Sequence, residues 1–516
     1  MLRIALVNAP LKSAVCDLGV GHQMPLGLLM VGGALRSRAE LKLIDAARDH
    51  LSDPEIVRRL ESFRADVVMI AHVGSTQSHP CCLRVLSAVK AAHPEVVTIY
   101  GGVYPTYHAR EIIAGHPEVD IIVRGEGEAT AIGLVDALTA GGDLTGVAGL
   151  TWRRNGEIIM NPARAPMEDL DAHPIGWDLI DDWDRYRAFG MGRAAVAQFS
   201  RGCPHSCTYC GQWMFWKRWR YRDVTRFVDE LEWLRRERDV RFIWLADENP
   251  TTIKDVWASV LAEIGRRKLG IGLCASIRAR DIVRDEDILH LYKAAGFFYV
   301  LMGVETVTDS TLDKIRKGSS VDDAYNAVRL LRRHGILSIV DYIFGIEEET
   351  PRTLWRGLRG LMKYDGDFVN ALYITPHSWT AMGREMQAAP IVEPDLWKWD
   401  YRHQIVGVNS LTPAQLFLGV KLIELAYHLH PRRFLRILFA EDRQARRQLR
   451  HCVGHISAVY WYELFEAVAD RLRARFRPPL SRPARPVPRE EEQPAMSGPT
   501  GPANPVRAGW SERGPD

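Results

Sequence analysis

The chain has 516 residues, more than one ordinary hydrophobic core can organise, and about 100–200 residues per domain predicts two or three domains. Hydrophobic residues make up 47% and charged residues 25%, which excludes a mainly disordered protein. The net charge of +3 creates little long-range field to attract a polyanion, so nucleic acid is not an expected partner.

The cysteine content points to a reducing compartment. Eight cysteines are too few for a disulfide scaffold of this length, and three of them are clustered, which indicates a metal or catalytic use. The first residues lack the basic region and apolar core of a secretory signal and are typical of a strand. No apolar run is long enough to span a bilayer. We therefore expect a cytoplasmic protein.

Residues 1–145 alternate short apolar runs with helical patterns, as a doubly wound parallel sheet requires, because strands buried on both faces form continuous apolar stretches. The expected strands are 3–8, 42–45, 66–71, 96–100 and 120–124, with helices at 54–62 and 82–92. Glycine-containing turns follow three of these strands and predict a ligand crevice at the carboxyl edge of the sheet. A tight turn without a ligand explains any single glycine equally well.

We expect a linker over 146–194, with a hairpin at Asn155-Gly156, and then a second βα series over 195–385. The expected strands of that series are 196–200, 240–246, 271–275, 297–303, 338–345 and 368–375. Six such units predict a partial (β/α)6 barrel with catalytic groups at the strand ends.

The region after the barrel has two parts. Residues 386–476 are expected to be a helical C-terminal region, apolar on one face and rich in Arg and His on the other. Packing against the preceding domain is the commoner explanation of such a pattern, and peripheral contact with a membrane is the alternative. Residues 477–516 are rich in proline and poor in large apolar residues, which predicts a disordered tail.

Cys203, Cys207 and Cys210 directly follow a predicted strand, and thiolates so close together can bind one soft metal centre. A zinc site would need a fourth ligand, and His205 inside the loop supplies one candidate, whereas Cys274 lies on another predicted strand. Three cysteine ligands would instead leave one iron of a [4Fe-4S] cluster open for chemistry.

The Cys-x3-Cys-x2-Cys pattern, with Tyr209 before the last thiol and at the end of a first barrel strand, resembles the radical S-adenosylmethionine (SAM) superfamily. This resemblance implies that the open iron binds the amino and carboxylate groups of SAM, and that reductive cleavage yields a 5′-deoxyadenosyl radical. Ala246 and Asp247 replace the glycines of the superfamily's Gly-Gly-Glu-like segment. The further cosubstrate contacts that the resemblance implies are Asp247, Glu248, Ser276, Arg278, Glu305 and Gly345.

An N-terminal Rossmann-like domain before such a barrel resembles the cobalamin-binding branch of the superfamily. The residues that the resemblance places against the corrin are Gly74, Ser75, Thr76, Gly101, Gly102, Gly125 and Glu126. The Asp-x-His-x-x-Gly signature is absent, and Tyr104 stands where several relatives have His, which argues against a histidine ligand to cobalt. A flavodoxin-like domain with a different ligand, or none, is the alternative.

The segment 211–223 is dense in aromatic and Arg side chains, which suit a flat platform for a planar substrate. Core packing of Trp213, Trp216 and Trp219 is the alternative interpretation. This segment resembles that of the anaerobic oxidative cyclases of magnesium-protoporphyrin IX monomethyl ester, which form the isocyclic ring of bacteriochlorophyll. The resemblance extends over roughly residues 1–400. His377 and Trp379 either line the substrate cavity or are structural.

The cyclase resemblance implies a tetrapyrrole substrate and an electron donor such as flavodoxin or ferredoxin. Gly211, Tyr209 and the segment 375–379 depart from the cyclase pattern. Two alternatives therefore stay open: a cobalamin-dependent radical SAM C-methyltransferase acting on a bacteriochlorin or hopanoid, and a non-catalytic corrinoid or iron-sulfur sensor.

Overall fold

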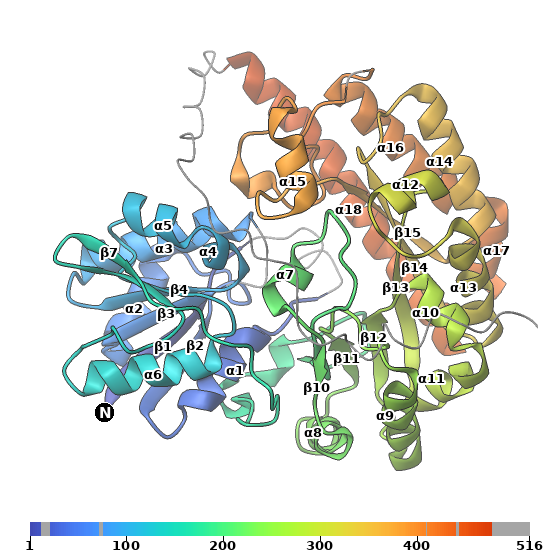
Figure 1. Ribbon diagram of the computed structural model, residues 1–516. Helices are drawn as coiled ribbons and strands as arrows, with labels where there is room; N and C mark the ends of the chain where they lie inside the picture. The colour runs from blue at the N-terminus through green and yellow to red at the C-terminus, as the bar shows by residue number, and fades with distance from the viewer. Residues whose placement is uncertain (12–20, 72–75, 409, 440–442, 477–516) are drawn as a thin grey trace, which may run out of the picture. The chain divides into compact units, whose positions relative to one another are not determined.

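The computed structural model describes residues 1–11, 21–71, 76–408, 410–439 and 443–476 (Figure 1). One compact unit extends from Met1 to Tyr462 and contains both predicted sheets, and a second unit begins at Glu463. Gly74, Ser75 and the predicted tail lie outside the described residues.

The N-terminal sheet has seven strands in the order β2-β1-β3-β4-β5-β6-β7, of which the first five are parallel. Its strands are β1 (Leu2–Asn8), β2 (Ala39–Asp45), β3 (Val67–Ala71), β4 (Val97–Gly101), β5 (Ile121–Val123), β6 (Leu150–Arg154) and β7 (Glu157–Met160). All five predicted strands are confirmed. The hairpin is also confirmed: Asn155 and Gly156 both have positive φ, as a two-residue turn of this kind requires, and its strands extend the sheet.

Helices cover both faces of this sheet because successive strand residues point to opposite sides. Ala5 and Val7 belong to the same apolar cluster as the buried residues of α2 and α3. Ile4 and Leu6, on the other face, belong to the cluster that contains buried residues of α1 and α6. The helices of this domain are α1 (Leu26–Leu35), α2 (Asp53–Phe63), α3 (Ser78–Ala92), α4 (Val103–Tyr107), α5 (Ala109–Gly115) and α6 (Glu128–Thr139). The predicted helices 54–62 and 82–92 correspond to α2 and α3.

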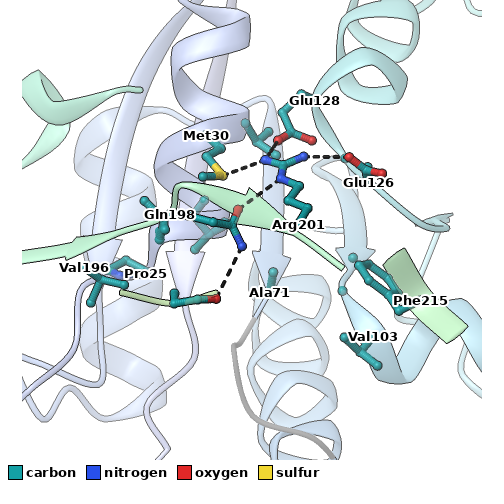
Figure 2. Close-up of a pocket in the computed structure, with 18 of the residues that line it drawn as sticks. Pro25, Met30, Ala71, Val103, Glu126, Glu128, Val196, Gln198, Arg201 and Phe215 are labelled. Atoms are coloured by element: carbon teal, nitrogen blue, oxygen red, sulfur yellow. Dashed lines mark hydrogen bonds and ion pairs between the residues drawn. The ribbon is translucent and has the colours of Figure 1, made fainter. Parts of the chain in front are cut away.

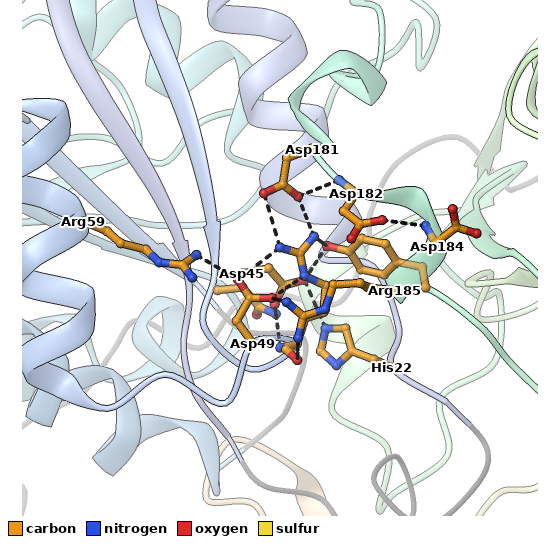
Figure 3. Close-up of polar contacts among 11 residues, drawn as sticks. His22, Asp45, Asp49, Arg59, Asp181, Asp182, Asp184 and Arg185 are labelled. Atoms are coloured by element: carbon orange, nitrogen blue, oxygen red, sulfur yellow. Dashed lines mark hydrogen bonds and ion pairs between the residues drawn. The ribbon is translucent and has the colours of Figure 1, made fainter.

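A buried ion network attaches the segment after the hairpin to the N-terminal sheet (Figure 3). The guanidinium of Arg48, just beyond β2, contacts Asp49 and Asp181, each at 2.7 Å. The hydroxyl of Tyr186 donates to Asp45 at 2.7 Å. Arg48 and Tyr186 are both buried. Their contacts therefore hold residues 181–186 against the carboxyl end of β2 before the chain enters the second sheet.

The second sheet has six parallel strands in the order β15-β14-β13-β12-β11-β8, the sequential order of a partial barrel. These strands are β8 (Ala194–Ala197), β11 (Phe242–Leu245), β12 (Gly272–Ser276), β13 (Phe297–Glu305), β14 (Leu337–Phe344) and β15 (Phe368–Tyr373). The first one is shorter than predicted. The chain leaves the barrel after Ala197, and β9 (Ser200–Arg201) pairs antiparallel with β10 (Arg220–Tyr221), which encloses the cysteine loop in a separate hairpin.

Amphipathic helices surround the barrel, and the predicted helical region follows it (Figure 1). The helices from the cysteine loop onward are α7 (Gln212–Trp216), α8 (Val224–Glu237), α9 (Lys254–Arg267), α10 (Ala279–Arg284), α11 (Leu289–Ala295), α12 (Asp309–Lys314), α13 (Val321–Arg333), α14 (Pro351–Tyr364), α15 (Ala381–Glu385), α16 (Pro413–His428), α17 (Pro431–Phe439) and α18 (Arg443–Phe476). Among the described residues, no helix is long and apolar enough to cross a membrane.

Candidate active site at the facing strand ends

The three clustered cysteines lie in the loop between β9 and α7, and all three are free thiols. Burial raises the pKa of Cys203 to about 12 and also raises the pKa values of Cys207 and Cys210. Lys317 and Arg278 act in the opposite direction on Cys207, because a nearby cation favours the thiolate. Since metals bind thiolates, these cations favour the ionised form of Cys207 that a metal ligand requires.

The loop does not fit a mononuclear zinc site. Each thiol is close enough to the other two to interact electrostatically. Yet in the described part of the chain no three His, Cys, Asp or Glu side chains converge on a point where one metal ion could bind. His205 contacts the guanidinium of Arg278 through its Nε2 atom. Three neighbouring thiols with no fourth ligand among the described residues suit a [4Fe-4S] cluster, which leaves one iron open.

A buried lysine that the sequence analysis missed supports the loop. Lys317 forms a buried ion pair with Glu305, and its Nζ atom lies 3.2 Å from the hydroxyl of Tyr209. The Tyr209 hydroxyl donates to Glu305 at 2.8 Å. The carbonyl of Lys317 also accepts from Arg278. Only tertiary contacts identify Lys317, because no spacing relates it to the cysteines; its sequence signal is limited to a Lys-Gly pair after a short helix.

Two carboxylic acids follow β11 and have different environments. Asp247 accepts from the amide and hydroxyl of Ser200 at 2.5 and 2.6 Å, so it fastens the start of the cysteine hairpin. Glu248 accepts from the amide of Gly202 at 3.3 Å and from the indole of Trp216 at 2.6 Å. Burial raises the pKa of Asp247 to about 6 and that of Glu248 to about 7.

The three tryptophans after the cysteines are not ordinary core residues, because each is partly exposed and donates its indole N–H to this region. Trp213 donates to the carbonyl of Cys207 at 3.2 Å, and Trp219 donates to the carbonyl of Asn249 at 3.0 Å. Trp216 bonds Glu248 at the end of β11. The aromatic segment therefore connects the cysteine loop to the strand end and leaves one edge of Trp216 on a cavity.

That cavity has about 1750 Å³ of atom-free space, partly open to solvent, and lies between the carboxyl edge of the N-terminal sheet and the ends of β8, β11 and β12. Glycine faces it where a bulky ligand needs room: a Cβ at Gly27 or Gly125 would meet no atom within 4 Å, and one at Gly101 would meet only Val123, at 3.8 Å or more. Gly125 also has φ of 76°, which favours glycine. These features fit a corrin. The described lining residues include no histidine.

An ion network closes one side of the cavity (Figure 2). Arg201 contacts Glu126 at 2.7 Å and Glu128 at 2.5 Å, and Arg220 contacts Glu126 at 2.7 Å. The guanidinium of Arg201 also lies 5.2 Å from the ring centre of Trp216. Glu126 thus lines the cavity with its charge already paired. The two arginines, which the sequence analysis missed, join the cysteine hairpin to the N-terminal domain.

The remaining predicted site residues lie in three places. The cavity lining brings together the predicted cobalamin and SAM residues Gly101, Gly102, Gly125, Glu126, Asp247, Glu248 and Ser276. Tyr209, Arg278 and Glu305 lie in the network beside the cysteines instead. Gly345, with φ of 89°, donates its amide to Glu349 at 3.1 Å and is not among the lining residues.

His377 and Trp379 occupy a contact between the domains and do not line this cavity. The Nδ1 atom of His377 lies 2.9 Å from the hydroxyl of Thr76, so Thr76 is also engaged away from the lining. The Trp379 ring stacks on Tyr107 with centres 5.2 Å apart. A Cβ at Gly211 would overlap the indole nitrogen of Trp379. This geometry favours the structural interpretation of both residues.

Comparison with known proteins agrees with this geometry. A family model of the radical SAM superfamily matches residues 197–359, and a model of the B12 binding domain matches residues 15–135. The chain is 39% identical over 464 residues to the anaerobic magnesium-protoporphyrin IX monomethyl ester cyclase of Synechocystis sp., covering 90% of this chain and 91% of the relative. The chain belongs to this cyclase family. The cyclase of Rubrivivax gelatinosus is 28% identical, with 88% of this chain and 82% of the relative covered.

Solved structures show the same fold as this member of the cyclase family. The radical SAM methyltransferase TsrM from Kitasatospora setae superposes with a TM-score of 0.66 at 17% identity, covering 84% of this chain and 90% of that one. The cobalamin-dependent SAM radical enzyme OxsB superposes with a TM-score of 0.63 at 16% identity, covering 92% and 75%. The family member is a radical SAM enzyme with three cofactors: a [4Fe-4S] cluster, SAM and cobalamin.

Proposed function

We propose that the chain catalyses the anaerobic oxidative cyclisation of magnesium-protoporphyrin IX monomethyl ester, the substrate named for its cyclase relatives. The cavity between the two sheets is the observation that carries this proposal. On one side the cavity has a glycine-lined surface that is suited to a corrin. On the other side it has the ends of the barrel strands that lie beside the cysteine loop. One partly open space thus lies against both cofactor sites and an aromatic wall.

In this proposal Cys203, Cys207 and Cys210 hold the cluster, which on binding supplies the electron that cleaves SAM to a 5′-deoxyadenosyl radical. The other roles belong to the chain's own side chains. The side chain of Glu248, which lines the cavity as Ser276 also does, receives the amino group of the cosubstrate. Arg278, next to the cysteine loop, receives its carboxylate.

Aromatic groups position the planar substrate. Phe215 and Trp216 line the cavity, and Trp244 lines it from β11. Flat rings attract a flat macrocycle by stacking and by excluding water. Gly101, Gly102 and Gly125 give the corrin its close approach to the N-terminal domain. A radical formed beside the thiols is therefore kept from solvent by the Trp216 wall and the Arg201 network.

The test is anaerobic incubation of the reconstituted protein with SAM, cobalamin, reductant and magnesium-protoporphyrin IX monomethyl ester, analysed by mass spectrometry. We expect a porphyrin whose mass corresponds to ring closure and a ketone oxygen. Cys207→Ala should abolish 5′-deoxyadenosine formation, and formation retained in that variant would refute the cluster assignment. Deoxyadenosine without any change in porphyrin mass would refute the cyclase assignment.

A cobalamin-dependent C-methyltransferase is the second candidate. The hopanoid C-3 methylase of Methylococcus capsulatus is 25% identical over 79% of this chain and 77% of its own length. The same cavity would suit a methyl donor on the corrin and a large apolar acceptor. A methylated product together with S-adenosylhomocysteine would favour this candidate over cyclisation.

The electron donor in this proposal is a flavodoxin or ferredoxin, because the cluster must be reduced one electron at a time. The reducing cytoplasm is the proposed compartment, and it is supported by the free thiols at all seven cysteines that the structure describes. Peripheral contact with a membrane is also proposed, through the helices that follow the barrel.

A further inference from the structure

Helix α16 buries its charged side chains and exposes apolar ones. Its only Lys, Arg, Asp or Glu residues are Lys421 and Glu424, and both are buried and paired with each other at 2.5 Å. Four leucines instead face outward: Leu418, Leu422 and Leu425 on the helix and Leu429 directly after it are 56%, 55%, 41% and 65% exposed. A helix on the water-facing surface of a barrel normally shows the opposite arrangement.

The outward leucines form one continuous stripe, because spacings of four, three and four residues return to the same side of a helix. Packing on the barrel does not account for this stripe. Another set of α16 side chains, including Leu416, Val420 and Tyr427, already fills the barrel contact. The exposed face carries no Lys, Arg, Asp or Glu residue, since the only two on this helix, Lys421 and Glu424, are buried. An uncovered apolar stripe of this length indicates an interaction surface.

The neighbouring helix α14 supplies positive charge beside this stripe (Figure 1). The two helices approach so closely that a Cβ at Gly419 would lie 2.6 Å from Leu354. Helix α14 has no acidic residue, and its cations Arg352, Arg356, Arg359 and Lys363 are all exposed. Trp355 on the same helix is 61% exposed. Arg356 pairs with Glu347 at 2.7 Å, but Arg352 and Arg359 pair with no described residue.

We propose that the α16 leucine stripe and the basic face of α14 form a docking surface for an anionic phospholipid membrane. The leucines would insert at the boundary between headgroups and acyl chains, where uncharged side chains gain most. Trp355 has the amphipathic ring that suits this interface. Arg352 and Arg359 would contact lipid phosphates. No residue of α14 or α16 lines the cofactor cavity, so the test of this docking surface does not depend on which reaction the enzyme catalyses.

The charge pattern favours a membrane over a second copy of the chain. A symmetric dimer through α16 would bring two α14 helices together, each with four cations and no acid to pair with across the interface. Anionic lipid places negative charge against the same residues. Anionic lipid is therefore the occupant whose charge complements this surface.

The experiment is co-sedimentation of the full, cofactor-loaded protein with vesicles of phosphatidylcholine, alone or mixed with phosphatidylglycerol. We expect binding to the mixed vesicles that weakens as salt is added, because salt screens the arginine contacts. Leu422→Glu with Leu425→Glu should lower the partition coefficient at least about tenfold. Arg352→Glu with Arg359→Glu should lower it about tenfold for mixed vesicles and little for phosphatidylcholine alone.

Matched controls separate this surface from general effects of charge and unfolding. Met160→Glu places a new acid on the exposed edge of β7, and Arg58→Glu with Lys268→Glu makes the same charge reversal at two exposed cations, one on α2 and one just after α9. Both should bind vesicles like the unchanged protein. Circular dichroism and the cluster absorbance confirm that each variant is folded.

Two results would overturn the proposal. One is the absence of binding to mixed vesicles. The other is a concentration-dependent dimer in light scattering that Leu422→Glu with Leu425→Glu dissociates, while vesicle binding is unchanged in that variant. The first result removes the membrane as a partner. The second assigns the stripe to a second copy of the chain.

Discussion

Removal of the Lys317 charge tests the network beside the cysteines. Lys317 and Glu305 are buried, only 7% and 4% exposed, so Lys317→Met leaves the Glu305 carboxylate without the cation that pairs with it. Removing one partner of a buried pair costs about 3–5 kcal/mol, because the remaining charge keeps its desolvation penalty. Replacing both charges avoids that penalty. We therefore expect Lys317→Met with Glu305→Gln to be more stable than Lys317→Met alone.

The expected shift in melting temperature follows from the size of the unit. An unfolding entropy of about 2.1 cal/mol/K per residue gives roughly 1 kcal/mol/K for a unit ending at Tyr462, so Lys317→Met should melt about 3–5 °C lower if that unit unfolds as a whole. Melting of the barrel alone would give a larger shift. Differential scanning calorimetry under anaerobic conditions measures the shift.

The double variant decides whether the pair interacts as described. We expect Lys317→Met with Glu305→Gln to recover more than half of the stability lost in Lys317→Met, with the two substitutions clearly non-additive. Tyr209 retains an acceptor, because the side-chain carbonyl introduced by Glu305→Gln can replace the carboxylate oxygen. A shift below about 1 °C for Lys317→Met, or a double variant as destabilised as the sum of the singles, would show that this ion pair is not buried as the structure has it.

Three further predictions concern the cavity and its edges. Gly101→Val should leave the melting temperature nearly unchanged, because a Cβ at this position meets only Val123 within 4 Å and the residue faces the cavity, but should weaken cobalamin binding in equilibrium dialysis; equal affinity would place the corrin elsewhere. Burial raises the folded-state pKa of Glu248 to about 7, so protonation stabilises the fold fully below about pH 4 and this stabilisation is lost as the pH rises through about 7. Melting temperatures between pH 5 and 8 should therefore fall more steeply for the unchanged protein than for Glu248→Gln, and parallel curves would contradict the assignment. Gly211→Ala should cost about 1–3 kcal/mol by overlap with Trp379 and lower the bound iron, whereas its combination with Trp379→Leu should cost less than the sum of the two single substitutions; a single Gly211→Ala variant with full stability and iron content would be the contrary result.

Local sequence patterns determined the larger part of the architecture. Apolar runs bounded by turns fixed all five parallel strands of the first sheet and the six strands of the barrel, because a strand buried on both faces has few alternatives. Asn155-Gly156 specified its hairpin through the positive φ that both residues adopt. The spacing of Cys203, Cys207 and Cys210 indicated a cluster loop by itself, since all three thiols lie within one short segment of the chain.

Tertiary structure alone decided which distant residues support that loop. Lys317 and Arg201 contact the site from positions that no sequence spacing relates to the cysteines, and both act through charges that are costly unless a partner lies nearby. The sequence also did not determine which face of α16 packs on the barrel. Its sequence is apolar on both sides, so periodicity could not say which face would cover the barrel, and only packing left Leu422 and its neighbours outside. A sequence determines short-range geometry through dihedral and periodic preferences, whereas burial and charge pairing are properties of residues brought together by the whole fold.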